Sequence, residues 1–356
     1  MRLLSSALCT TVAVGLLAGC SGNMSATNPT TPTAGTQSRV SSGHVIPHWA
    51  KYASVIPGII PPAMRIPQRD IHPPKKATAG GIYVSEFYNT TMFGYQHKNT
   101  ANNGPTCSIA PVSYVNNVAS DMAGNLIEPD GGSRTVNVFS GPGMCGSLLG
   151  TFADSYGQPS DAASLNAATG TIAIGNIFDN SGAPGSVSVC TVSGGCTANL
   201  TNSAMYEVAG VAMDKSGNCW ADAINSGGTA TLTYFAGCAG GGTAATGFVN
   251  SGFGGLDIDN KGNIVSVDIN STAVYVYSGC NPACTLVGGP FSLHGSTVFG
   301  HLNKQSMTYA AGDYGNGEVD VYTYNPTNLA YWYSFNNGLS ASYDVEGVAF
   351  NPASKQ

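Results

Sequence analysis

The chain has 356 residues, of which 42% are hydrophobic and 9% charged, with 47 glycines against 19 prolines. This length allows a sizeable core, which excludes a disulfide-stapled mini-domain, and the low charged fraction excludes coiled coils and Glu/Lys-rich helical bundles. The net charge of −6, with no basic run in the main body, argues against nucleic acid as a partner.

Charge divides the chain into two regions. Residues 1–78 carry seven basic residues and one acidic residue, Asp70, whereas the remainder carries six basic and 18 acidic residues. This asymmetry implies two regions with different roles. A basic N-terminal segment therefore precedes an acidic body, which we place at residues 79–356.

Residues 1–19 have the pattern of an export signal, with Arg2 ahead of an apolar run too short to span a bilayer. The run ends on Leu17-Ala-Gly-Cys20, which resembles the lipobox of bacterial lipoproteins. The resemblance implies that diacylglycerol alkylates the Cys20 thiol, and Ser21 after it favours the outer membrane, with the body on its periplasmic or its outer face. An ordinary secretory signal with a chance cysteine is the alternative.

Residues 20–78 connect this lipidated cysteine to the body. The part up to residue 42 is Ser, Thr, Asn, Pro and Gly with little to bury, which predicts a flexible tether. Residues 43–77 mix apolar residues with frequent prolines, which favours extended chain. We expect this strip to pack along the acidic body, because Trp49 would otherwise be exposed; a semi-rigid spacer near lipid headgroups is the alternative.

An internal repeat of about 45 residues organises the body. Turn glycines recur at Gly124, Gly170, Gly217 and Gly262, with spacings of 46, 47 and 45 residues. Each turn joins two short apolar strands, and an alternating third strand follows, for example residues 231–235. The period suits the four-stranded blade of a β-propeller and is too long for leucine-rich or ankyrin repeats.

The two ends of the body complete one another. Residues 347–351 supply only an opening strand, and residues 81–86 and 91–95 supply strands that this last unit lacks. One blade shared between both ends would close the ring and remove its free edges. Counting that blade gives six over 278 residues, or about 46 each. The sequence thus predicts an all-β, six-bladed β-propeller with a closing blade shared by the N- and C-terminal strands.

The pattern of strand, Gly-Asn turn and strand ending on Asp resembles NHL-type and related six-bladed propellers. This superfamily includes calcium-dependent lactonases of the SMP-30 type, which hold their metal with Glu, Asn and Asp in the central channel. Glu207, Asp344 or Glu346, and Asn116 or Asn117 are the comparable side chains here, although no motif fixes the correspondence. The resemblance implies the fold rather than the chemistry.

Eight cysteines remain after Cys9 in the leader and Cys20, an even number that suits disulfides in an exported protein. Three pairs follow from their places on the blades and the fourth by elimination. The expected pairs are Cys219 with Cys238, Cys190 with Cys196, Cys280 with Cys284, and Cys107 with Cys145.

Acidic and amide side chains recur at the ends of the second strands. These residues are Glu86, Asp130, Asn176, Asp222 and Asp268, with Asp313 as a looser candidate. Such a ring could hold Ca²⁺ through oxygen ligands, or each member could bond the amides of the following turn. We favour the structural role, because a feature found in every blade answers a need that every blade shares.

The acidic residues outside the repeat are more informative. Glu207, Asp344 and Glu346 stand near the starts of innermost strands, where other blades have Gly or apolar residues. With Asn117, they are candidates for binding a cation or a basic group, or for acid–base work. A solvated loop charge is the simpler interpretation, which we favour.

Histidines and aromatic residues give weaker signals. The body offers His97, His294 and His301, of which the last two flank the start of the sixth blade; surface or core roles are favoured over a metal site. The aromatic residues near the last blade are candidates for stacking on carbohydrate or on a protein partner, or for packing between blades. They are Tyr324, Tyr331, Trp332 and Tyr333.

The sequence contains no Gly-x-Ser-x-Gly elbow, phosphate loop or His-Glu-x-x-His motif. We therefore expect a monomeric binding or scaffolding module, with an unknown ligand, anchored to the membrane by its lipid and without a cofactor. A metal-dependent hydrolase or lactonase that uses Ca²⁺ is the alternative, and a purely architectural envelope protein is the third option.

Overall fold

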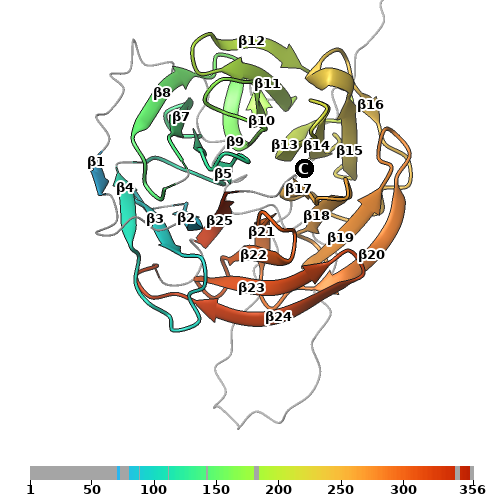
Figure 1. The fold of residues 1–356 in the computed structure, drawn as a ribbon. Helices are drawn as coiled ribbons and strands as arrows, with labels where there is room; N and C mark the ends of the chain where they lie inside the picture. Colours follow the sequence, from blue (N-terminus) through green and yellow to red (C-terminus); the bar gives the residue numbers. More distant parts are fainter. Residues whose placement is uncertain are drawn as a thin grey trace, which may run out of the picture. The chain divides into compact units, whose positions relative to one another are not determined.

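Six antiparallel sheets surround a common axis in the computed structural model (Figure 1). The structure describes residues 70–72, 80–87, 89–110, 112–141, 143–179, 184–340 and 345–352. The export signal, Cys20, the tether, Trp49 and Asp344 lie outside the described residues. Within them, no helix has the length and apolar character that crossing a bilayer requires, and the helical structure is one short turn, η1 (Ala236–Cys238).

Each sheet is one blade, and its strands are given below in order from the axis to the rim. The innermost strands of blades 1 to 6 are β25 (Val345–Asn351), β5 (Ala119–Ser120), β9 (Gly157–Ser164), β13 (Glu207–Met213), β17 (Leu256–Ile258) and β21 (Thr297–Leu302). The second strands are β2 (Gly81–Glu86), β6 (Leu126–Asp130), β10 (Ile172–Asp179), β14 (Cys219–Ile224), β18 (Ile264–Asp268) and β22 (Thr308–Asp313). The third strands are β3 (Met92–Gln96), β7 (Thr135–Phe139), β11 (Ser186–Thr191), β15 (Ala230–Phe235), β19 (Ala273–Ser278) and β23 (Glu318–Asn325). The outer strands are β4 (Cys107–Ala110), β8 (Leu148–Ala153), β12 (Gly195–Leu200), β16 (Thr243–Ala244), β20 (Thr285–Ser292) and β24 (Asn328–Phe335).

The shared closing blade is confirmed. The C-terminal strand β25 pairs antiparallel with β2, from Gly81 opposite Asn351 to Glu86 opposite Val345, and both strands are buried along their whole length. A fifth strand, β1 (Asp70–His72), pairs with the outer strand β4 of the same blade. For these three residues, the segment before the body lies against it, as we expected of the proline-rich strip.

The Gly-Asn turns recur because an aspartate holds each of them. The turn glycines Gly124, Gly217 and Gly262 have φ values of 89°, 80° and 83°, a backbone conformation that favours glycine. An Asp three residues earlier accepts the backbone N–H of the following Asn on one oxygen and the Asn side-chain amide on the other. The pairs are Asp121 with Asn125, Asp214 with Asn218, and Asp259 with Asn263. The repeat thus encodes a side-chain-locked β-hairpin.

Apolar packing between neighbouring blades makes up most of the core. Six hydrophobic clusters each join two adjacent blades. Between blades 5 and 6, for example, the valines of β18 and β19 pack against Tyr309, Tyr322 and Tyr324. A seventh cluster draws on five blades and includes Phe87 and Phe299. Because its members come from around the ring, this cluster closes the axis with apolar side chains.

The four predicted disulfides are confirmed. Three of them close hairpins or loops within a blade. The fourth, Cys107–Cys145, joins β4 of blade 1 to the segment between β7 and β8 of blade 2, across a sequence separation of 38 residues. This bond therefore ties the closing blade to its neighbour.

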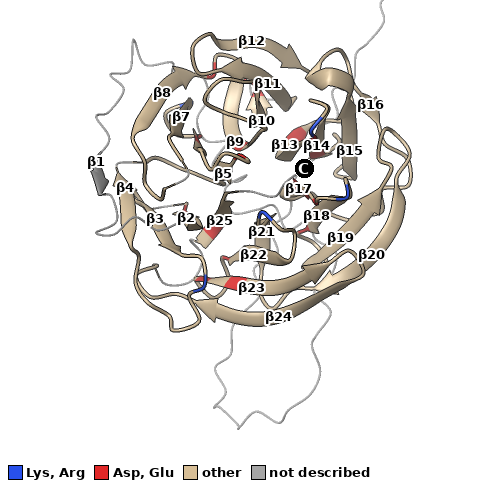
Figure 2. Ribbon diagram, viewed as in Figure 1, with Lys and Arg blue, Asp and Glu red and all other residues tan. Residues whose placement is uncertain are grey.

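The outer strands of the six blades are uncharged, although β1, which pairs outside β4 in blade 1, contains Asp70. Strands β4, β8, β12, β16, β20 and β24 contain no Asp, Glu, Lys or Arg, and their ribbons are tan in Figure 2. Several of their large apolar side chains are exposed, among them Leu149, Leu286 and Trp332. The rim thus offers apolar contact area, whereas the acidic residues lie closer to the axis.

Candidate functional site

The carboxylates at the ends of the second strands cap turns, as the structural interpretation predicted. Asp130 accepts the backbone N–H groups of Ser113 and Ser133, at 3.0 and 2.9 Å. Asp268 accepts the N–H groups of Ser251, Asn270 and Ser271. Each accepting oxygen satisfies amides that the turn would otherwise leave unpaired.

Asp313, Asn176 and Glu86 also use their side chains locally. Asp313 accepts the N–H groups of residues 315 and 316, and Asn176 donates to the hydroxyls of Ser186 and Ser188. Glu86 accepts hydrogen bonds from the Asn89 side chain and the Ser340 backbone. These contacts give the repeated side chains a structural role.

Asp222 does not belong to this set. Strand β14 runs on to Ile224, so Asp222 pairs with Leu232 inside the sheet rather than at its hairpin end. Asp222 follows its turn glycine, Gly217, by five residues, whereas Asp130 and Asp268 follow theirs by six. This one-residue difference turns the side chain to the opposite face of the strand. Asp222 therefore points into the interface with blade 5, where the Ser266 hydroxyl donates to it at 2.9 Å. Burial there raises its pKa well above the ordinary value.

The strongest constellation of polar side chains lies on the innermost strands β9, β17 and β21 and on the segment that precedes β5. The amide nitrogen Nδ2 of Asn117 lies 2.7 Å from Asp161 Oδ1 and 3.0 Å from His301 Nε2, and His301 Nδ1 lies 3.5 Å from Asp257 Oδ2. Because these residues belong to blades 2, 3, 5 and 6, they meet only at the axis. All four side chains are buried or nearly so. We refer to Asn117, Asp161, Asp257 and His301 as the axial cluster.

Both axial carboxylates already hold the backbone. Asp161 accepts the N–H groups of Ala162 and Val211, each at 2.8 Å, and so joins blade 3 to blade 4. Asp257 accepts the N–H groups of Ile258 and Leu302, at 2.7 and 2.6 Å, and so joins blade 5 to blade 6. The axial cluster therefore stitches neighbouring innermost strands together.

Burial sets the electrostatics of the axial cluster. Burial raises the pKa of Asp161 to about 6, against the opposing effects of His301 and of the hydrogen bonds that the carboxylate accepts. Burial alone would lower the pKa of His301, but its contact with Asp257 and the charge of Asp161 outweigh burial and raise it. In the neutral imidazole, Asn117 Nδ2 donates to His301 Nε2, which leaves the ring proton on Nδ1, 3.5 Å from Asp257.

The space at the axial cluster is small. A cavity of about 20 Å³ is bounded by side chains of five blades, including Ser120, Ser164, Asp257 and His301. This volume holds about one water molecule, whereas sites for organic ligands are roughly 300–1,000 Å³. The apolar cluster around Phe299 closes the axis near the starts of the innermost strands. The axial cavity therefore does not admit an organic substrate in this structure.

Of the residues expected near the channel, only Asn117 joins the axial cluster. Glu207 is the first residue of β13, opposite Ile224, and burial raises the pKa of its carboxyl. Glu346 is buried within β25, at an irregularity in its pairing with β2. Asp344 is outside the described residues.

The two histidines near blade 6 belong to different sites. His301 is axial, whereas His294 lies in the segment between β20 and β21, with Nδ1 3.5 Å from Asp320. His97 packs its ring against Phe350.

The repeat contained a signal for the axial residues, because Asn117, Asp161, Asp257 and His301 replace Gly, Ala or Val of the corresponding innermost strands.

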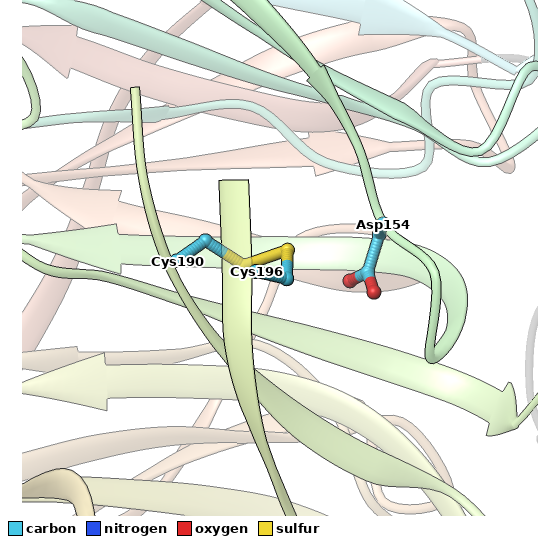
Figure 3. Close-up of side chains that lie close together, drawn as sticks. All are labelled: Asp154, Cys190 and Cys196. Atoms are coloured by element: carbon cyan, nitrogen blue, oxygen red, sulfur yellow. A yellow bond between two sulfur atoms is a disulfide. The ribbon is translucent and has the colours of Figure 1, made fainter. Parts of the chain in front are cut away.

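A disulfide makes one group of potential metal ligands unable to bind a metal. Asp154 lies beside Cys190 and Cys196, as Figure 3 shows, but the two sulfur atoms are bonded to each other. Only a thiolate is a metal ligand, so this group has a single carboxylate left to offer. The Ser188 hydroxyl and the Tyr156 N–H already donate to that carboxylate.

The comparisons with known proteins support the fold and leave the family open. No protein-family model matches the sequence, and no curated protein matches it. A chain in the crystal structure of a nidogen/laminin complex is 12% identical, with a TM-score of 0.54 over 78% of this chain and 99% of that one. A protein of unknown function from Bacteroides caccae is 10% identical, with a TM-score of 0.54 over 77% and 99%. At these identities the likeness shows the propeller fold alone.

Proposed function

We propose that this protein is a lipoprotein of the bacterial cell envelope that acts as a monomeric binding or scaffolding module, with its NHL-like propeller displayed from a lipid on Cys20. We choose binding over catalysis because of the arrangement of side chains at the propeller axis. Asp161 and Asp257 are occupied by backbone amides of neighbouring strands, and the cavity beside them holds about one water molecule. We therefore expect a partner to bind at the outer surface of the propeller.

The exposed aromatic residues of blade 6 support this role. On the uncharged strand β24, Tyr331 and Trp332 are 47% and 41% exposed, and Lys98 Nζ lies 5.0 Å from the centre of the Trp332 ring. Exposed aromatic rings beside a cation are well suited to the core of a contact, because they combine apolar area with a polar edge. Tyr324, in contrast, is buried between blades 5 and 6.

The anchor is tested in cells. We expect a radiolabelled fatty acid to be incorporated into the full chain, and Cys20→Ser to abolish both the label and the recovery in the membrane fraction. Incorporation that persists in Cys20→Ser, or membrane recovery without it, would refute the anchor.

The binding role is tested with a matched pair of surface variants. We expect affinity capture from envelope extracts to retain a protein or glycan partner, and Trp332→Ser to weaken retention at least tenfold, on the order of a lost aromatic anchor. Leu149→Ser, on strand β8, removes a side chain of similar exposure, 43%, and should leave retention unchanged. Equal effects of the two variants, or no partner that survives washing, would contradict the role of the blade 6 surface.

A further inference from the structure

Blade 6 carries a second group of ionisable side chains, none of which belongs to the axial cluster. Asp313 ends β22 and pairs with Glu318 at the start of β23, and Asp320 follows two residues later on the same face. His294 reaches them from the segment between β20 and β21. One nitrogen or oxygen atom of each of the four residues lies within 4.8 Å of the others.

The distances in this group are those of ligands that share a cation. His294 Nδ1 lies 3.5 Å from Asp320 Oδ1 and 3.8 Å from Glu318 Oε1. Both exceed the roughly 2.7–3.2 Å of an N–H···O hydrogen bond. Two ligands of a tetrahedral metal, each about 2.1 Å from it, are about 3.4 Å apart. The spacing therefore fits a bridging ion better than direct hydrogen bonding.

Asp320 gives an independent indication that a ligand is required here. Its side chain is fully buried, and its Oδ1 atom, which faces His294, accepts no hydrogen bond from the described residues. A buried acceptor without a hydrogen-bond partner is destabilising, and more so when it is charged. A bound cation would supply the missing partner of this oxygen atom.

Two tyrosines and a glycine hold the group in place. The Tyr322 hydroxyl accepts the backbone N–H of His294 at 2.8 Å and donates to Asp320 Oδ2 at 3.3 Å. The His294 ring stacks on Tyr331, with 4.6 Å between ring centres. At Gly295, an added Cβ would lie 1.7 Å from Asp313 Oδ2, so only glycine fits beside that carboxylate. Such supporting contacts orient ligands before an ion arrives.

We propose that His294, Asp313, Glu318 and Asp320 bind one divalent transition-metal cation of the Zn²⁺ or Mn²⁺ type. The imidazole nitrogen favours Zn²⁺ over Ca²⁺ and Mg²⁺, which prefer sites made entirely of oxygen, and the three carboxylates also suit Mn²⁺. The His294 side chain is half exposed and gives the ion a route from solvent. Asp313 Oδ1 accepts the N–H groups of Gly315 and Asn316, and Oδ2 accepts the Asn316 side-chain amide. Oδ2 therefore keeps one lone pair for the metal.

The direct test is calorimetric titration of the full chain with Zn²⁺, together with Mn²⁺ and Ca²⁺ for comparison. We expect Zn²⁺ and Mn²⁺ to bind more tightly than Ca²⁺, with one ion lost per chain in His294→Ala. His97→Ala removes a histidine outside the group and should bind like the wild type. Co²⁺ should give visible absorption in the wild type and in His97→Ala, and none in His294→Ala.

Asp320→Asn separates metal binding from a merely structural role. It keeps the size of the side chain and removes one buried like charge, so the metal-free variant should unfold at the same temperature as the wild type or higher. Its Zn²⁺ affinity should fall at least about 100-fold. Two results would overturn the proposal. One is Zn²⁺ binding that is equal in the wild type, His294→Ala and Asp320→Asn; the other is no binding to the wild type at millimolar Zn²⁺.

Discussion

The disulfide between Cys107 and Cys145 offers a quantitative test of how the ring is held together. It joins blade 1 to blade 2 across 38 residues of sequence, whereas Cys280–Cys284 closes a separation of four residues within blade 5. A cross-link restricts the unfolded chain more when the loop it closes is longer. The chain-entropy relation gives about 4 kcal/mol for the first bond and about 2 kcal/mol for the second.

The assay is equilibrium unfolding in urea under oxidising conditions. The two variants are Cys107→Ala with Cys145→Ala, and Cys280→Ala with Cys284→Ala. We expect both variants to unfold at lower urea than the wild type, and the first to lose about twice as much free energy of unfolding as the second. Cys107, Cys145 and Cys280 are buried and Cys284 is partly buried, so truncation removes some packing in both variants.

A reductant supplies the control. With all disulfides reduced, the wild type and both variants should unfold at similar urea concentrations, because the cross-links that distinguish them are gone. The reasoning is refuted if the short loop matters as much as the long one. It is also refuted if the difference between the variants persists in the reductant, since that would place the effect in packing rather than in the cross-link.

Three further predictions concern acidic residues. Since burial raises the pKa of Asp161 from 3.8 to about 6, the folded state binds this proton more tightly than the unfolded state does. Its contribution to stability is full below pH 4 and is lost as the pH rises to about 6, a change of about 3 kcal/mol. Unfolding midpoints measured between pH 4 and 7 should show this slope, and Asp161→Asn should flatten it; an equal slope in the variant would contradict the assignment. Asp268→Ala leaves three turn amides without their acceptor, so calorimetry should show a loss of about 1–3 kcal/mol, and a neutral result would deny the capping role. Addition of Ca²⁺ should not raise the melting temperature through the axial cluster; a rise that Asp161→Asn abolishes would instead favour the calcium-dependent hydrolase.

The architecture could be predicted because its signal is repeated. An Asp, Gly and Asn in fixed order lock each hairpin turn, so the same local chemistry returns with each blade and reveals the period. The closing blade followed from counting strands at the two ends. Three disulfides followed from places on the blades, as where antiparallel pairing sets Cys190 opposite Cys196, and Cys107–Cys145 followed by elimination. Each of these inferences rests on local geometry.

The functional side chains were harder to predict because they meet only after the ring closes. Asn117, Asp161, Asp257 and His301 are separated by as many as 184 residues, and each interrupts a different copy of the repeat. Asp222 was misplaced for a different reason: it lies one residue closer to its turn glycine than Asp130 and Asp268 do, so its side chain is on the other face of the strand. The blade 6 group escaped notice because His294 belongs to a connecting segment whose path the repeat does not specify.

The pairing of β25 with β2 ties the fate of the whole molecule to its last strand. During synthesis Val345–Asn351 emerges more than 250 residues after Gly81–Glu86, and until it arrives the buried β2 has no neighbour on its axial side. A polypeptide that ends between residues 303 and 344 keeps five of its innermost strands yet leaves that flank open to proteases and to other chains. Closure of the ring, and with it protection of β2, therefore depends on the seven residues of β25.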